Sequence, residues 1–365
     1  MPLQLGLVGL PNVGKSTLFN ALTSAGAEVA NYPFTTIAPN VGVAVVEDPR
    51  LRRIAAIVGP ERVVPATFQV VDVAGLVEGA SRGEGLGNQF LSHVRTVDAI
   101  AMVVRCFRDE HVPHVTPYLD PVEDIDTIQL ELVLADLAVL ERHLERVQSQ
   151  AKARPRDYEA EVASIERVLA GLRAGQLVRQ MALDEHERGY LAEVPLLTTK
   201  PTLYVANVDE EQLPDGGEMA AAVRARAEAE GAAVVVLSAQ TESELLAWEP
   251  DEARAYLAAL GLESPALERF VWASYRLLSY ITFFTTTGGK EVRAWTLPRG
   301  ETALQAAAAI HSDMARGFIR AEVVSYEDLD RAGSIAKARE AGKLRLEGRD
   351  YVVQDGDVIH IRFAV

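Results

Sequence analysis

The chain has 365 residues, a length that favours two or three domains. Apolar residues make up 48% and charged residues 24%, as in ordinary soluble globular proteins. The 36 basic and 52 acidic residues give a formal net charge of -16, so the chain repels nucleic acid on average and an RNA contact requires a local patch. We expect no sequence-specific DNA partner.

The N-terminus shows no basic leader or cleavage site, and no stretch reaches the length of a membrane span. We therefore expect a cytoplasmic protein with no membrane partner. The single cysteine, Cys106, excludes an intrachain disulfide and a cysteine-based metal site. It ends an apolar run, and we expect a buried structural thiol rather than a redox sensor.

Short apolar runs alternate with helical segments at the start of the chain and again after residue 200. The first helix is predicted at 15–24. The predicted strands lie at 3–9, 67–73, 99–104, 202–206 and 233–237. Strands that alternate with helices predict an α/β fold with a doubly wound, mostly parallel sheet. We assign this sheet to one domain made of residues 1–124 and 196–278.

Residues 125–195 have a helical pattern, in which leucines recur at positions 130, 134, 137 and 144. Pro155 interrupts the pattern, which predicts an inserted antiparallel helical hairpin. Basic residues gather around the break: Arg146, Lys152, Arg154 and Arg156. This tip is either a solvated surface or a contact for RNA or the ribosome.

Residues 279–365 predict a small α+β domain. Its expected strands lie at 281–287, 292–297, 351–353 and 358–363, with one helix at 303–314. From Ile281 onward there are 12 basic and 12 acidic residues, so the net negative charge belongs to residues 1–280. The densest basic run is a second candidate RNA surface, or a solvated face: Arg331, Lys337, Arg339, Lys343 and Arg345.

Residues 9–16, GLPNVGKS, match the phosphate-binding pattern G-x-x-x-x-G-K-[ST] between a predicted strand and helix. In such a loop the backbone N–H groups and the helix N-terminus surround phosphate oxygens. Lys15 is the candidate catalytic cation for the β and γ phosphates, and the Ser16 hydroxyl is a candidate Mg²⁺ ligand. The nucleotide-binding residues expected here are Asn12, Val13, Gly14, Lys15, Ser16 and Thr17.

Asp72 and Gly75 form the D-x-x-G pattern that accompanies such a loop. Asp72 is expected to hold Mg²⁺ through water, and Gly75 to offer its N–H to the γ-phosphate. Glycines at 79, 83, 85 and 87 then predict a mobile segment, which suits a phosphate-sensing switch. Either Thr35 or Thr36 should also ligate Mg²⁺; the residues alone do not choose between them.

The base site departs from the guanine-selective pattern N-K-x-D. Asn207 is followed by Val208 in place of lysine, and Glu210 stands where a shorter aspartate accepts two hydrogen bonds from guanine. The site therefore lacks the lysine and the shorter aspartate with which such proteins select guanine. Ser238 and Ala239 match the loop that packs beside the base.

Together with these motifs, longer runs resemble the YchF, or Obg-like ATPase, family over the whole chain. They lie at 9–17, 32–36, 72–81, 83–91, 103–107, 290–296, 317–322 and 350–358. The resemblance implies a C-terminal TGS domain of ubiquitin-like fold, ATP preferred over GTP, and binding to the ribosome, as the large subunit or whole particle, and its RNA. It also favours Thr36 over Thr35 as the Mg²⁺ ligand.

Leu76 stands where many relatives use glutamine to orient the attacking water, so we expect slow hydrolysis without an activator. His114 resembles a family histidine proposed for this role; the alternative is a plain loop histidine. Asn12 occupies the position at which some relatives hold K⁺, a second candidate cation. The alternatives to an ATPase switch are an Obg-class GTPase and a ribosome- or RNA-binding module with negligible turnover.

Overall fold

The computed structural model describes residues 4–27, 40–73, 86–114, 118–152, 154–287 and 289–364. Its first six-stranded sheet has the order β2-β4-β1-β5-β6-β7, and all neighbouring pairs are parallel except β2 with β4. The strands are β1 (Gln4–Val8), β2 (Val41–Val46), β4 (Ala66–Asp72), β5 (Ala99–Arg105), β6 (Thr202–Asn207) and β7 (Ala233–Leu237).

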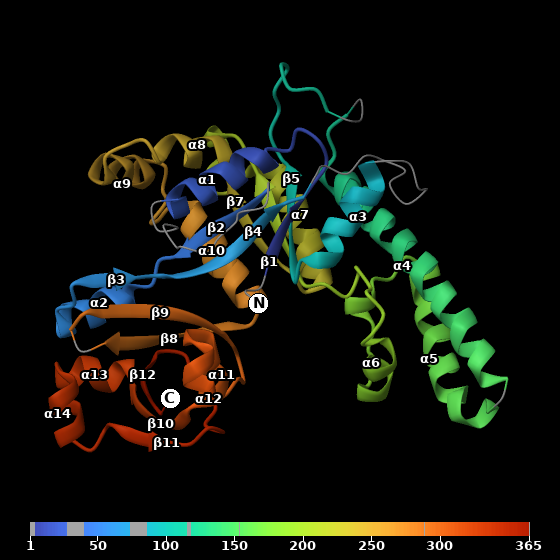
Figure 1. Cartoon of the computed structure of the whole chain (residues 1–365). Helices are drawn as coiled ribbons and strands as arrows, with labels where there is room; N and C mark the ends of the chain where they lie inside the picture. Colours follow the sequence, from blue (N-terminus) through green and yellow to red (C-terminus); the bar gives the residue numbers. More distant parts are fainter. Residues whose placement is uncertain are drawn as a thin grey trace.

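Helices cover both faces of this sheet. Figure 1 shows α1 (Lys15–Ala27) and α10 (Ala266–Leu277) on one side and α3 (Leu86–Thr96) and α4 (Pro121–Ala151) on the other. Every residue of β5 and β6 is buried, as expected for central parallel strands. The predicted doubly wound sheet is confirmed. The helices are α1 (Lys15–Ala27), α3 (Leu86–Thr96), α7 (Gly217–Glu230), α8 (Ala239–Leu245), α9 (Pro250–Ala259) and α10 (Ala266–Leu277), with the short 3₁₀ helix η3 (Glu210–Gln212) after β6.

The inserted hairpin is formed by α4 (Pro121–Ala151) and α5 (Pro155–Arg173), which point away from the sheet in Figure 1. Asp120 caps α4 by accepting hydrogen bonds from two backbone N–H groups, and a proline begins each helix. The short helices η2 (Val178–Gln180) and α6 (Glu185–Leu191) follow.

The predicted leucine stripe on the first hairpin helix is partly wrong. Leu130 and Leu134 are 57% and 37% exposed, whereas Leu137 and Leu144 pack against the hairpin core. The reason is that α4 serves two cores. Leu132 belongs to the core of the sheet, while Leu140 faces α5. The stripe therefore rotates along the helix, which a single periodic pattern does not predict.

The second six-stranded sheet has the order β11-β10-β12-β8-β9-β3. Its strands are β3 (Arg62–Val64), β8 (Tyr280–Thr287), β9 (Glu291–Pro298), β10 (Phe318–Ser325), β11 (Arg345–Glu347) and β12 (Asp357–Phe363). The helices beside it are α11 (Ala303–Ile310), α12 (Ser312–Arg316), α13 (Tyr326–Ala332) and α14 (Ile335–Glu340). The predicted C-terminal α+β unit is confirmed.

Two details of that unit differ from the prediction. The helix expected at 303–314 is divided because His311 is extended, at φ -165° and ψ 141°, and its ring accepts a hydrogen bond from the Asp313 N–H in the first turn of α12. The strand expected at 351–353 is replaced by a single bridge between Thr302 and Val352.

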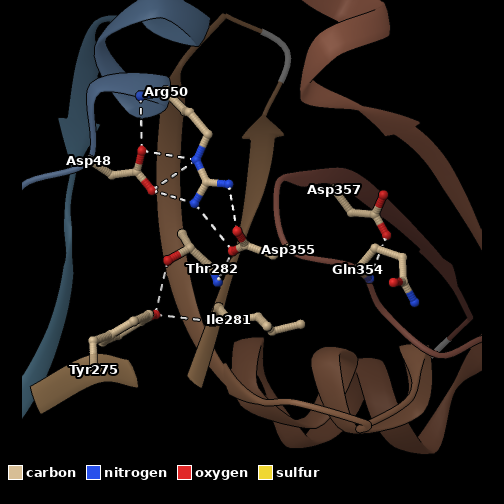
Figure 2. Close-up of polar contacts among 8 residues, drawn as sticks. All are labelled: Asp48, Arg50, Tyr275, Ile281, Thr282, Gln354, Asp355 and Asp357. Atoms are coloured by element: carbon tan, nitrogen blue, oxygen red, sulfur yellow. Dashed lines mark hydrogen bonds and ion pairs between the residues drawn. The ribbon is translucent and has the colours of Figure 1, made fainter. Parts of the chain in front are cut away.

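The chain segment 41–72, which begins and ends in strands of the first sheet, is also joined to the C-terminal sheet. Strand β3 pairs in parallel with β9, and α2 (Pro49–Val58) lies beside it. Figure 2 shows Arg50 of α2 between two carboxylates, 2.8 Å from Oδ2 of its helix cap Asp48 and 2.8 Å from Oδ2 of Asp355. Asp355 also accepts the Thr282 N–H at 2.9 Å.

Burial raises the pKa of the Asp355 carboxyl, but the hydrogen bonds from Arg50 and Thr282 outweigh burial and hold that pKa below its ordinary value. The same chain segment ends in β4, whose last residue is Asp72. The phosphate side of the first sheet and the C-terminal sheet are thus connected by one short stretch of chain.

In the part of the chain that the structure describes, no helix combines the length and the apolar character that crossing a membrane requires.

Candidate functional site

The turn between β1 and α1 has the shape that the phosphate motif requires. Two of its residues have positive φ, Asn12 at 63° and Gly14 at 89°. A Cβ on Gly14 would lie 2.2 Å from Nδ2 of Asn207, so a side chain is excluded there by both space and backbone conformation. Helix α1 begins at Lys15 and directs its N-terminus at this turn.

Three side chains predicted to handle phosphate and Mg²⁺ lie together. The Lys15 ammonium forms an ion pair with Oδ1 of Asp72, and the Ser16 hydroxyl donates to Oδ2 of Asp72 at 3.2 Å. Lys15 is 9% exposed, and a buried ammonium needs an opposite charge, which the Asp72 carboxylate supplies. A hydroxyl and a carboxylate side by side suit Mg²⁺, which prefers oxygen ligands and keeps several waters or phosphate oxygens.

No group of three or more histidine, cysteine, aspartate and glutamate side chains with metal-binding geometry occurs among the described residues. Ser16 and Asp72 offer two adjacent oxygen ligands, and an Mg²⁺ ion held there would take its remaining ligands from phosphate and water, as in P-loop sites.

Asn207 at the end of β6 joins the phosphate turn to the base side. Its Nδ2 donates to the Val13 carbonyl at 2.9 Å, and its Oδ1 accepts the Ala239 N–H at 2.9 Å. Ser238 caps α8, next to this bond. Val208 is 2% exposed. Asn207 therefore fixes the relative positions of the two loops, a role that the motif alone did not reveal.

A cavity of about 1140 Å³ extends from the phosphate turn to the base side. Its lining includes Asn12, Lys15, Ser16, Asn207, Glu210 and Ala239. The structure thus brings the predicted phosphate-binding and base-binding residues to one cavity large enough for a nucleoside triphosphate.

Glu210 has two partners that the sequence did not reveal. Its Oε2 lies 3.1 Å from the hydroxyl of Thr241 on α8, and its Oε1 lies 2.7 Å from the hydroxyl of Tyr256 on α9. The bond to Glu210 raises the pKa of the Tyr256 hydroxyl. Tyr256 is 46 positions from Glu210 in the chain, so no local pattern announces this contact.

The loop after β5 is fastened to the phosphate turn. Nδ2 of Asn12 donates to the Pro113 carbonyl at 3.1 Å. Arg105, 3% exposed, donates to four carbonyls of the same loop, those of Phe107, Asp109, Val112 and Pro113. Arg105 was not among the predicted site residues; an arginine directly after a predicted buried strand was the signal in the sequence.

His114 follows Pro113, but the cavity lining in the described part of the chain does not include it. Nε2 of His114 lies 3.1 Å from Oδ2 of Asp124 at the start of α4, and both side chains are less than 10% exposed. Burial raises the pKa of the Asp124 carboxyl, and the hydrogen bond with His114 opposes this rise.

Cys106 is fully buried, and burial raises the pKa of its thiol to about 12, which agrees with the predicted structural thiol.

Several predicted site residues lie outside the described residues. They are Thr35, Thr36, Gly75, Leu76, Gly79, Gly83 and Gly85.

A glycine-containing turn between a buried strand and a helix N-terminus, with lysine, serine and aspartate converging beside it in a mostly parallel sheet, defines a P-loop nucleotide-binding protein. Residues 4–165 match a family model described as a 50S ribosome-binding GTPase. Residues 280–364 match the model YchF-GTPase_C, described as a protein of unknown function (DUF933).

Relatives match over the entire length. The ribosome-binding ATPase YchF of Bacillus subtilis is 50% identical over 367 residues, and that of Pasteurella multocida is 52% identical over 365 residues, with 100% of both chains covered in each case. The solved structure of the Schizosaccharomyces pombe YchF GTPase has a TM-score of 0.89 and 34% identity, and covers 99% of this chain and 98% of its own. The chain belongs to the YchF family, and the resemblance found in the sequence is confirmed.

Proposed function

We propose that this chain is a Mg²⁺-dependent P-loop triphosphatase that prefers ATP to GTP and serves as a nucleotide-dependent switch on ribosomes. The observation that carries this proposal is the convergence of Lys15, Ser16 and Asp72 at the N-terminus of α1, at one end of a cavity that contains Glu210. The names of the bacterial relatives, ribosome-binding ATPases, support it.

In the proposed mechanism the phosphates replace Asp72 as the partner of Lys15. The buried ammonium then binds the β and γ phosphates, and the backbone N–H groups of residues 12–17 surround them. Ser16, Asp72 and Thr36 are the proposed Mg²⁺ ligands, with Asp72 acting through water. When bound, Mg²⁺ neutralises the charge that develops between the β and γ phosphates. Gly75 would donate its N–H to the γ-phosphate.

Activation of the attacking water is proposed to need more than these residues, because Leu76 has no polar atom to orient water. His114 is the candidate group. Its support is the fastening of Pro113 to Asn12, which ties the loop before His114 to the phosphate turn. The Asp124 carboxylate beside Nε2 selects which ring nitrogen carries the proton. Turnover is therefore expected to be slow without an activator.

K⁺ is proposed as a second cation at the phosphates. Nδ2 of Asn12 is used by the Pro113 carbonyl, which leaves Oδ1 as the side-chain atom that can ligate a cation. A cation there would supply charge like that of an arginine finger, an effect worth about 10³ to 10⁵ in rate.

The base preference is tested by calorimetry with non-hydrolysable ATP and GTP analogues in the presence of Mg²⁺. Relatives are named both ATPase and GTPase, so this measurement decides between them for this chain. We expect tighter binding of the ATP analogue, and a gain in GTP affinity when Val208→Lys is combined with Glu210→Asp. Tighter binding of the GTP analogue to the unaltered chain would contradict the proposal.

The ribosome contact is proposed to use the hairpin tip, where Lys152, Arg154 and Arg156 are exposed. The C-terminal basic run is less available, because Arg339 pairs with Glu322 and Lys343 pairs with Asp328. The large subunit or whole particle, with its RNA, is the proposed partner, and the cytoplasm is the proposed location.

The proposed domains are a nucleotide-binding domain at 1–124 and 196–278, a hairpin domain at 125–195 and a TGS domain at 279–365.

Co-sedimentation with ribosomes should depend on whether an ATP analogue, ADP or no nucleotide is present. Equal co-sedimentation in all three states would contradict the switch.

A further inference from the structure

The carboxylate of Glu210 is held from both sides by hydroxyl groups. Tyr256 has one hydroxyl hydrogen and lies 2.7 Å from Oε1, so it donates to this oxygen, since an ionised carboxylate only accepts. Thr241 lies 3.1 Å from Oε2. These donors come from two helices, α9 and α8, so the carboxylate is fixed in orientation as well as in position.

The Thr241 hydroxyl lies close to a second oxygen, that of Ser238. Its Oγ1 lies 3.0 Å from Oγ of Ser238 as well as 3.1 Å from Glu210. The single hydroxyl hydrogen of Thr241 therefore has two possible acceptors, and the charged Glu210 carboxylate is the stronger of them. Thr241 is 4% exposed and Ser238 is 4% exposed, so water does not compete strongly for these bonds.

Guanine and adenine make different demands on such a carboxylate. Guanine presents two adjacent donors, N1–H and N2–H₂, and needs both carboxylate oxygens free along one edge. Adenine presents one exocyclic amine and needs a single acceptor. At Glu210 each oxygen already accepts a hydroxyl hydrogen, so the two oxygens are no longer both free along one edge, while a remaining lone pair can still accept one amine hydrogen.

We propose that Thr241 and Tyr256 are specificity-determining positioning residues, which hold the Glu210 carboxylate so that it accepts one amine hydrogen from adenine and does not present both oxygens to guanine. This inference rests on the proposed ATP preference. It assigns the preference to a three-residue arrangement, in which the length of Glu210 matters because the longer side chain reaches both hydroxyl groups.

The test measures the affinities of non-hydrolysable ATP and GTP analogues by calorimetry with Mg²⁺, for the full-length chain and for Tyr256→Phe, Thr241→Val and the double variant. Both changes keep the shape of the side chain and remove the hydroxyl. We expect the preference for ATP over GTP to fall about tenfold in the double variant, mainly through a gain in GTP affinity, because one hydrogen bond to a charged group is of this size.

A third change separates positioning from a general loss of structure. Adding Glu210→Gln to the double variant should abolish the gain in GTP affinity, because an amide presents its own donor to the guanine donors. Tyr158→Phe on the hairpin is the matched control for loss of a tyrosine hydroxyl. Trp248→Phe alters the ring that lies 5.1 Å from Tyr256 and leaves its hydroxyl in place. Both controls should keep the wild-type preference, and thermal unfolding checks that every variant is folded.

Each outcome decides a separate question. If the unaltered chain prefers ATP and the double variant keeps that preference within twofold, the inference is overturned and the proposed function stands. If the double variant loses the preference and Glu210→Gln removes the gain in GTP affinity, the inference is supported. If the unaltered chain does not prefer ATP, the proposed base preference itself is refuted, whatever the variants do.

Discussion

Replacement of Asn207 by alanine should separate the phosphate turn from the base side of the site. The change removes two buried hydrogen bonds of 2.9 Å and leaves the Val13 carbonyl and the Ala239 N–H without their partner. A buried polar group that loses its partner costs about 1 to 3 kcal/mol. Water can form hydrogen bonds with these two groups in the variant and so reduces the cost. We therefore expect the free energy of unfolding of the nucleotide-binding part to fall by about 3 kcal/mol, which corresponds to a fall of about 6 to 12 °C in Tm.

Scanning calorimetry with and without an ATP analogue measures this loss. The transition that nucleotide shifts upward belongs to the nucleotide-binding part, which identifies it in a chain with more than one unfolding unit. Nucleotide affinity should fall at least about tenfold, since both loops lose their common anchor. Asn20→Ala, at an exposed position on α1, is the matched control and should shift Tm by less than about 2 °C. An Asn207→Ala protein with Tm within 2 °C of the original and unchanged affinity would refute the role of this bridge.

ATP turnover should be faster in K⁺ than in Na⁺, and Asn12→Ala should remove the difference; equal rates in the two salts would leave Asn12 as a turn residue only. Reversal of charge in the double variant Arg154→Glu/Arg156→Glu should weaken co-sedimentation with ribosomes and leave turnover in isolation intact, whereas undiminished co-sedimentation would place the contact elsewhere. His114→Ala should lower turnover at saturating ATP with little change in ATP affinity; a normal rate would assign His114 to the support of Asp124. The lowered pKa of Asp355 stabilises the folded state above its unfolded pKa of about 3.9, and this contribution disappears as pH falls through the lower folded pKa, so Asp355→Asn should reduce Tm more at pH 7 than at pH 3. An equal loss at both pH values would show that charge is not its source.

The parts of the molecule that were predictable from sequence are those set by neighbouring residues. The phosphate turn needs Gly14 where φ is positive and Lys15 at the first position of a helix, and both requirements are visible in eight consecutive residues. The central strands were predictable because β5 and β6 are continuous apolar runs buried on both faces.

The parts that sequence did not predict depend on distant segments. Arg50 and Asp355 are 305 positions apart, and β3 pairs with a strand more than 200 residues away. Glu210 and Tyr256 meet only because α9 returns to the base side of the cavity. Leu130 is exposed because α4 changes the core that it serves along its length. In each case the partner is chosen by tertiary packing, which leaves no periodic trace in the sequence.

The central claim, that the residues around Lys15 bind and hydrolyse MgATP, is tested most directly by phosphate release from ATP with Mg²⁺, with and without ribosomes, for the original chain and for Lys15→Ala. Lys15 supplies the buried charge that the β and γ phosphates would neutralise. We predict slow but measurable release by the original chain and none above background by Lys15→Ala in either condition, although the variant remains folded. Release by Lys15→Ala at a rate near that of the original chain would contradict the account.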